Sequence, residues 1–494
     1  MSTLVIMLVC LPFATALVTW VAPVKFSQYL TMIVATATFS VALILLPRTS
    51  HEIVTAGSPL RVDALSQVFL LVVTFLYMTT SIFAKGYLSL GEGAKAHRYG
   101  RRFYAGFNLF CWTLIVVPLV NGLALLWVAI EITTVISALL VAIDDTEGAS
   151  EAAWKYVLLA SLGLGIALFA TIMMYYAGTR LHGASYSLSY TTLLSGAAHY
   201  DPKIVRFAFV LAVLGYGTKM GLFPVHTWLP DAHSEAPTPV SALLSGALLA
   251  VSFYAILRFF QIAVLSLGPS FPRSVLLIFG VATLLLAALY LLSQRDMKRL
   301  LAYSSVEHMG ILAIGMSFSA TIAVVGVLLQ VLAHAAAKST AFFGVGSVVR
   351  KFGTKDMTKI RGGVGALPWS GPMLVLAVLA LSAMPPFGIF RSEFDIVYGG
   401  LSQPRDVIVA IFVVLVIVAF FGLSWFTTET MLSEDPSASL FSGGVIVVNK
   451  GEVSNWIVAS MIVGLVALLI LGVHPPTPLV HLLDRAAAEL RGSR

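Results

Sequence analysis

Apolar residues fill long, nearly unbroken stretches of this chain, and polar residues gather in the segments between them. A helix needs roughly 20 mainly apolar residues to cross a bilayer, and about fourteen stretches approach that length. They cover residues 3–22, 28–47, 63–84, 103–119, 121–143, 153–176, 204–222, 238–263, 272–293, 300–317, 320–345, 371–399, 406–428 and 455–473. The pattern predicts an all-α integral membrane protein with about 14 transmembrane helices.

Prolines interrupt this apolar pattern in two segments of similar sequence, LFPVHTWLPDAH at 222–233 and MPPFGIFRSEF at 384–394. Lipid tolerates such a break only where the freed backbone groups face protein or a hydrated cavity. Paired breaks in corresponding halves point to the ion or substrate path of a repeat-built transporter. Lys219 comes just before the first break and Glu393 follows the second. The chain is therefore predicted to move charge.

A second likeness indicates an internal repeat. Ala-Ala-Trp-Lys at 152–155 and Ala-Ala-Ala-Lys at 335–338 each precede a proline break. The order of helix, lysine-bearing helix and broken helix thus occurs twice, over 103–263 and 272–428. Since the number of spans between equivalent helices is odd, the units are predicted to be two inverted five-helix repeats, each with a proline-broken helix. Residues 1–102 are assigned to N-terminal transmembrane helices, and 429–494 to a C-terminal transmembrane helix and tail.

Composition agrees with a membrane protein: 59% of residues are hydrophobic, 11% are charged, and the mean hydropathy is +0.94. The net charge is +7. Successive loops lie on alternate sides of the membrane, and the loops of one side hold roughly twice as many basic residues as the loops of the other. By the positive-inside rule this bias places both termini outside the cytoplasmic (inner) membrane, and it removes the reason to expect a nucleic-acid partner. The first apolar stretch has no basic residue before Lys25, so we expect a retained helix rather than a signal peptide.

Ionisable residues inside the predicted spans are few, and intramembrane charge is costly and usually functional. Glu131 stands alone within LLWVAIEITTVISALL, and Lys219 is its expected partner, because opening and closing such a pair can release and take up protons. In the second half, His334 and Lys338 are four residues apart and share one helix face. The proton relay is predicted to comprise Glu131, Lys219, His308, His334, Lys338 and Glu393, supported by Lys155, His226, Asp231 and Glu307.

Two features exclude other chemistry. The polar segment HTWLPDAHSEAPTP lacks the close spacings of zinc ligands, so we expect a loop that lines a water entry and not a metal site. Cys10 and Cys111 both lie in apolar stretches without a C-x-x-C pattern, so the chain has no ligand set for an Fe–S cluster. No cofactor is expected in this chain, and another subunit would carry the electrons of any redox reaction.

The runs KMGLFPVHTWLPDAHSEAPTPVSALLSG, DMKRLLAYSSVEHMGI, HAAAKSTAFF and MPPFGIFRSEF resemble the antiporter-like membrane subunits of respiratory complex I and of Mrp antiporters. SSVEHMGI and PPFGIFRSEF look most like the F-type membrane component of group 4 energy-converting hydrogenases (hydrogenase 4 and formate hydrogenlyase). The resemblance implies fourteen helices and a proton path with Glu131 and Lys219 coupled, Lys338 central and Glu393 at the exit. It also implies other membrane subunits and a peripheral hydrogenase or dehydrogenase arm that holds Fe–S and Ni–Fe centres.

One position departs from that pattern. Relatives in complex I carry a lysine in the helix after HTWLPDAH, where this chain has Ala250, so the relay would cross by water, by His334 or by a hydroxyl such as Ser245 or Ser252. The interpretation favoured here is a proton-translocating subunit of a redox-driven complex embedded in membrane lipid. Three alternatives stay open: a complex I subunit, a cation/proton exchanger that could use sodium, and a subunit of an inorganic-carbon uptake complex.

Overall fold

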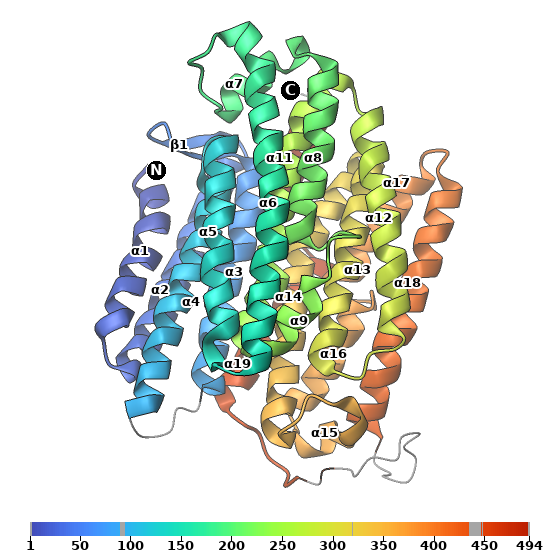
Figure 1. The fold of residues 1–494 in the computed structure, drawn as a ribbon. Coiled ribbons are helices and arrows are strands. Elements are labelled where there is room, and N and C mark those ends of the chain that lie inside the picture. The colour runs from blue at the N-terminus through green and yellow to red at the C-terminus, as the bar shows by residue number, and fades with distance from the viewer. Residues whose placement is uncertain (1, 89–93, 319, 434–445, 447, 493–494) are drawn as a thin grey trace.

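The protein is a bundle of long helices, described by a computed structural model for residues 2–88, 94–318, 320–433, 446 and 448–492 (Figure 1). In this described part, 11 helical segments are long and apolar enough to cross a membrane. They are α1 (Ser2–Val21), α2 (Val24–Thr49), α3 (Ala64–Tyr87), α4 (Ala94–Leu119), α5 (Leu123–Val141), α6 (Glu147–His182), α10 (Thr238–Leu243) continuing through η3 (Leu244–Leu248) into α11 (Leu249–Leu267), α12 (Ser270–Leu291), α14 (Thr321–Phe352), α18 (Asp406–Thr427) and α19 (Asn455–Val473). Each coincides with one of the predicted apolar stretches.

The remaining predicted stretches form helices that are shorter or more charged. In α8 (Pro202–Met220) the basic residues Lys203, Arg206 and Lys219 lower the hydropathy, and α13 (Met297–Ser317) likewise carries three charged residues, Lys298, Arg299 and Glu307. The predicted broken segment is divided into α16 (Ser370–Leu381) and α17 (Gly388–Leu401). The structure therefore supports a helical membrane protein, while the count of fourteen spans stays a prediction.

Both proline breaks occur where the sequence predicts them. Helix α8 ends at Gly221, whose φ of 90° suits glycine, and the chain passes through a cis Phe223–Pro224 bond to α9 (Trp228–Glu235). Between α16 and α17 the backbone turns at Ala383, with a φ of 54°, and contains a cis Pro385–Pro386 bond. Breaks of this kind are tolerated in a membrane protein only where the freed backbone groups face protein or a hydrated cavity.

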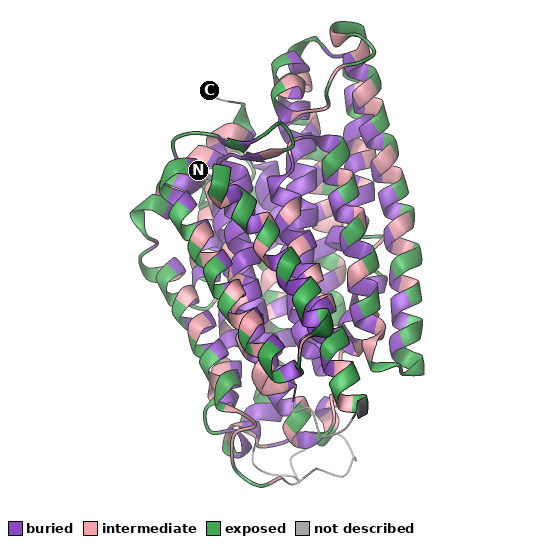
Figure 2. Ribbon diagram, turned by 90° about the vertical axis from the view of Figure 1, so that its left-hand side faces the viewer, coloured by how far each residue is buried: buried purple, intermediate pink, exposed green. Residues whose placement is uncertain are grey.

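Burial divides the bundle into an inner and an outer set of helices (Figure 2). The segment Thr238–Leu267 is 100% buried over its most apolar window and α3 is 83% buried, whereas α1 and α18 are 33% buried. Close approach of α6 and α8 depends on small residues, since a Cβ on Gly215 would lie 2.5 Å from the backbone nitrogen of Ala167. The inner helices are thus surrounded by helices whose exposed faces are apolar.

Several shorter elements close the ends of the bundle. Strands β1 (Val54–Ala56) and β2 (Leu60–Val62) pair antiparallel. The other short elements are η1 (Ala142–Asp144), α7 (Tyr190–Gly196), η2 (Ala197–His199), η4 (Met357–Lys359), α15 (Gly363–Ala366) and η5 (Thr428–Leu432). After the last long apolar helix the chain forms α20 (Thr477–Arg491), in which Leu479, Leu482 and Leu490 recur at helical spacing and are buried.

A buried ion-pair network connects helices at the end of the bundle where both termini lie (Figure 1). Arg258 lies within α11, is 1% exposed, and donates to Asp63 at 2.6 Å. Burial would raise the pKa of Asp63, but the Arg258 guanidinium outweighs it and holds that pKa well below its usual range. Glu489 of α20 accepts from the backbone N–H of Leu65 at 3.3 Å. Burial, followed by the charge of Asp63, raises the pKa of Glu489 to about 7.

Candidate functional site

The first lysine of the predicted relay lies at the last turn of α8, inside the bundle. Lys219 is fully buried, and its Nζ donates to the Ile130 carbonyl at 2.9 Å and to Thr133 Oγ1 at 2.7 Å. It also contacts the hydroxyl of Thr134. All three partners belong to one turn of α5, so neutral oxygens, rather than a carboxylate, hold the amine.

Glu131 occupies the same turn of α5 but points toward another helix. It is partly exposed, and its Oε1 accepts from Ser161 of α6 at 3.2 Å. Its Oε2 is buried and has no hydrogen-bond partner among the described residues. No ion pair within 4.0 Å joins Glu131 to Lys219, although Lys219 binds the carbonyl of the residue directly before it. Their coupling stays a prediction.

The second lysine, Lys338 of α14, is also fully buried and donates to the Leu301 carbonyl of α13 at 2.9 Å. Ser305 donates to the same carbonyl at 3.0 Å and shares a 2.7 Å hydrogen bond with Ser245 of η3. The hydroxyl of Ser252 instead bonds within its own helix, to Leu248 at 2.8 Å. Of the two hydroxyls suggested to replace the lysine absent at Ala250, Ser245 is therefore the one that reaches α13.

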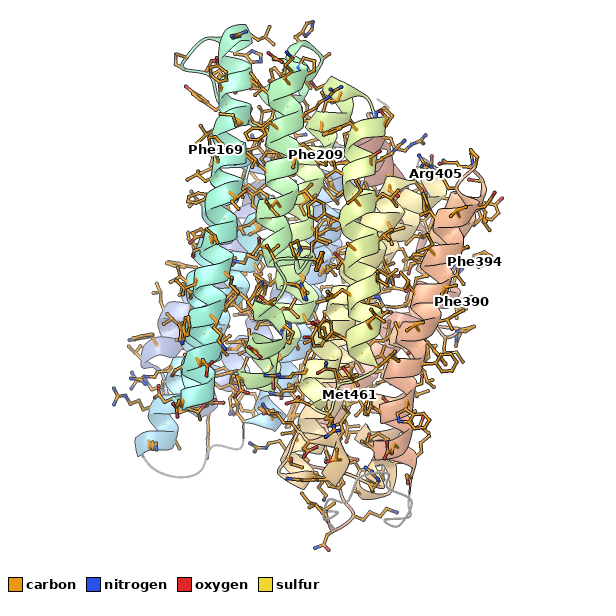
Figure 3. The ribbon with its side chains drawn as sticks, turned by 45° about the vertical axis from the view of Figure 1, so that its right-hand side comes forward. Phe169, Phe209, Phe390, Phe394, Arg405 and Met461 are labelled. Atoms are coloured by element: carbon orange, nitrogen blue, oxygen red, sulfur yellow. The ribbon has the colours of Figure 1, made fainter. Side chains whose placement is uncertain are left out.

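Beyond Lys338, two histidines and a glutamate lie along one side of α14. The rings of His308 and His334 have centroids 5.0 Å apart at 61°. Glu393 of α17 lies with its Oε1 3.9 Å from His308 Nδ1, too far for a direct hydrogen bond. It is 5% exposed, whereas Phe390 and Phe394 on the outward face of α17 point away from the bundle (Figure 3).

A residue that the sequence analysis missed bridges this gap. Gln330 Nε2 lies 3.1 Å from both His308 Nδ1 and Glu393 Oε1, and its Oε1 accepts from Ser392. Because the amide donates to Nδ1, the imidazole of His308 has its proton on Nε2 in this arrangement. Gln330, His334 and Lys338 follow one another at intervals of four and therefore share one helix face. This spacing alone could have placed Gln330 beside the predicted relay.

His233 is a further buried histidine outside the predicted relay. It lies in α9, is fully buried, and has its ring centroid 5.9 Å from that of Phe342 in α14. Its Nδ1 is 2.8 Å from the Leu229 carbonyl, and its Nε2 has no partner in the described part of the chain. The first broken segment thus sends a titratable group toward the helix that carries Lys338.

The predicted supporting residues divide into buried and peripheral ones. Glu307 is 2% exposed and His226 is 5% exposed, and each has a buried atom without a partner among the described side chains. Lys155 pairs with Glu151 at 2.6 Å and lies 3.9 Å from Asp231, which Arg299 holds at 2.6 Å. Lys155 and Asp231 therefore belong to an ion-pair network at the surface of the bundle rather than to the buried row.

In the described ranges of the chain, no group of three or more His, Cys, Asp or Glu side chains is placed to hold a metal ion. His226, Asp231 and His233 accordingly do not converge on one point, and Asp231 faces Arg299 instead.

Comparison with known proteins gives three kinds of similarity. Residues 120–419 match the family model described as NADH:quinone oxidoreductase/Mrp antiporter, TM. The chain is 38% identical over 343 residues to a hydrogenase-4 component F homolog of Methylacidiphilum infernorum, covering 68% of this chain and 72% of that protein. It is 31% identical over 359 residues to NADH-quinone oxidoreductase subunit N of Desulforudis audaxviator, covering 72% and 70%.

Solved structures share the fold at lower sequence identity. A chain of the Mrp complex from Dietzia sp. superposes with a TM-score of 0.86 at 21% identity, covering 99% of this chain and 97% of that one. A chain of an archaeal membrane-bound sulfane sulfur reductase gives a TM-score of 0.84 at 21% identity, covering 99% and 98%.

Proposed function

Since this chain belongs to the NADH:quinone oxidoreductase/Mrp antiporter transmembrane family, we propose that it is the proton-translocating subunit of a redox-driven membrane complex. The similarity to a hydrogenase-4 component F homolog favours a group 4 membrane-bound hydrogenase as that complex. The observation that carries the proposal is the pair of fully buried lysines, Lys219 and Lys338, whose hydrogen-bond partners among the described residues are neutral oxygens.

The physical reason is the cost of charge at this depth. A lysine that binds carbonyl and hydroxyl oxygens can donate hydrogen bonds whether or not it carries the extra proton, so its contacts do not fix its protonation. A proton that arrives creates a charge that the surroundings disfavour, and it moves on when a neighbouring group changes charge. Such a pair can therefore relay protons with small movements of side chains.

The polar groups are arranged in the order that a path needs. In the first half, Glu131 lies beside the oxygens that hold Lys219. Ser245 and Ser305 then lead toward Lys338, and Gln330 leads from His308 to Glu393. In this proposal protons pass between the ionisable side chains by way of hydroxyls and water, and Glu393 is the exit group. Gln330 orients His308 and Glu393 through its two hydrogen bonds and does not itself carry the proton.

The proposed architecture follows from the same repeat. Adding α8, α13 and the divided α16–α17 segment to the 11 long apolar segments would give the fourteen spans predicted from the sequence. The inverted repeats would then cover 103–263 and 272–428, and the end of the bundle rich in lysine and arginine would face the cytoplasm across the inner membrane.

The decisive experiment compares Lys338→Ala with Lys85→Met in the assembled complex. Lys85 is a matched control because its buried Nζ has no hydrogen-bond partner in the described part of the chain and instead lies over the rings of Tyr29 and Trp456, at 3.7 and 3.6 Å from their centroids. Lys338→Ala should abolish proton translocation while the complex still assembles. Lys85→Met should lower stability but leave translocation intact, and equal translocation in both variants would contradict the proposal.

The partner is identified by purification in mild detergent. Under this proposal the chain brings down further membrane subunits and a peripheral arm with Fe–S and Ni–Fe centres, detected by metal analysis. Recovery with other antiporter subunits and no redox protein would favour a cation/proton exchanger, and sodium dependence of transport would then identify the ion. Recovery with a soluble zinc protein would favour inorganic-carbon uptake.

A further inference from the structure

A pocket of about 630 Å³ opens at the basic end of the bundle, where α1 ends and α4 begins. It is lined by Trp20 from α1 and by His97, Arg98, Arg101 and Arg102 from α4. Arg101 fixes its shape, since its Nε and Nη2 donate to the Trp20 carbonyl at 3.0 and 2.7 Å. The pocket lies apart from the buried row of lysines and histidines, so its role is independent of the proposed function.

The lining carries three arginines and no acidic side chain among the described residues. Helix α4 has no acidic residue in its first turn, and Arg98 and Arg102 are both exposed. Among the described residues, none of the three arginines forms an ion pair within 4.0 Å of a carboxylate. Clustered guanidinium groups of this kind attract an anion, and they hydrogen-bond phosphate oxygens particularly well.

An apolar surface continues directly from the pocket along α1. Phe13, Leu17 and Val21 are 40%, 59% and 69% exposed, and Trp20 at the pocket is 64% exposed. Tryptophan concentrates at the level of lipid headgroups, with its ring between the polar and apolar layers. The surface therefore offers basic groups at headgroup height and an apolar helix face at acyl-chain depth.

We propose that this pocket binds the headgroup of an anionic phospholipid, with the phosphate against Arg98 and Arg102 and an acyl chain along α1. Basic pockets between transmembrane helices at the basic side of a membrane have the charge that such headgroups need. A soluble phosphate compound would use the guanidinium groups but leave the apolar face of α1 unused, so the lipid fits both halves of the surface.

The test measures which lipid lies beside Trp20 in the full-length protein reconstituted in phosphatidylcholine vesicles. Dibrominated phosphatidylglycerol or dibrominated phosphatidylcholine is added as quencher, and the Trp20 signal is the difference between the wild type and Trp20→Phe. The wild type should be quenched more strongly by phosphatidylglycerol at 0.01 M salt. The preference should fade at 1 M salt, where the screening length shortens from about 30 to 3 Å.

The variant Arg98→Gln with Arg102→Gln leaves Arg101 and its bonds to Trp20 in place. It should lower the relative association of phosphatidylglycerol on the order of fivefold for each charge removed at low salt. The matched control is Lys359→Gln with Lys450→Gln, which removes the same charge from exposed positions at the same end but outside the pocket. The control should keep the wild-type preference.

Four outcomes would overturn the proposal. The wild type could be quenched equally by both lipids, or the arginine variant could keep the preference. Glycerol 3-phosphate could abolish the preference at the same concentration as the lipid, which would identify a soluble phosphate compound as the ligand. In the assembled complex, Trp20 could be inaccessible to both lipids, which would show that a partner protein covers this surface.

Discussion

Replacing Gln330 by methionine tests whether the amide connects His308 to Glu393. Methionine has a similar volume, so packing is largely kept. The substitution removes two hydrogen bonds of 3.1 Å and leaves His308 Nδ1 and Glu393 Oε1 separated by 3.9 Å without a bridge. Ser392 keeps partners, because its hydroxyl also donates to the Gly388 and Ile389 carbonyls at 3.0 and 2.9 Å.

The expected decrease in the translocation rate follows from the burial of this region. Each buried polar group that loses its partner costs about 1–3 kcal/mol. If one such loss falls on the proton-transfer step, the rate of translocation should decrease about 5- to 150-fold, since 1.36 kcal/mol is a factor of ten. The stability of the chain should decrease by a similar amount for each group.

The assay is acidification of vesicles that contain the assembled complex, followed with a pH-sensitive dye and normalised to electron transfer and to the amount of complex. Gln67→Met is the matched control, because Gln67 is also a fully buried glutamine but donates to the Ala42 carbonyl at 2.7 Å, away from the relay. The control should lose stability without losing translocation. Translocation by Gln330→Met within twofold of the wild type would refute the role of the amide.

Three further predictions concern other parts of the molecule. Glu131→Gln and Lys219→Met should each reduce translocation to near background while assembly persists, and the double variant should be no worse; additive losses would mean that the residues act independently. Ser245→Ala should slow translocation about fivefold, for a loss of about 1 kcal/mol, whereas Ser252→Ala should have little effect; equal rates in the two variants would remove the hydroxyl route. The contribution of Glu489 to the docking of α20 should be full below its unfolded pKa of about 4.3 and lost as the pH rises to its folded value of about 7, so protection of α20 from protease should be greater at pH 5 than at pH 8. Glu489→Gln should abolish this difference, and persistence of the difference would assign it to another group.

The sequence predicted the long helices and the breaks because both depend on local features. A run of about twenty apolar residues is long enough for a spanning helix, and prolines near glycine or next to a second proline favour a break. Single prolines do not suffice, since α1, α2 and α4 continue past Pro12, Pro47 and Pro118. Lys219 and Lys338 could be chosen as candidate relay residues in the same way, because a charged residue within an apolar run is costly and is usually functional. These features require no knowledge of which helices touch.

The relationships between helices could not be predicted in that way. Gln330 has no charge to attract notice, and its importance arises only because α13 and α17 bring His308 and Glu393 to its two sides. Nothing near Arg258 in the sequence names its partner, because Asp63, which neutralises it inside the bundle, lies nearly two hundred positions earlier. Glu131 and Lys219 were expected to pair directly, but no ion pair joins them in the structure. Such a contact depends on side-chain rotamers and on the rotation of each helix about its axis, and sequence spacing gives neither.

The two ends of the described chain lie at the same end of the bundle (Figure 1). A chain that leaves a membrane on the side where it started has crossed it an even number of times. The 11 long apolar segments are an odd number, whereas the proposed fourteen spans agree with this parity. The parity also means that reporters fused at residues 2 and 492 should read the same compartment, and that inserting a single extra crossing anywhere between them would send every later loop to the wrong side.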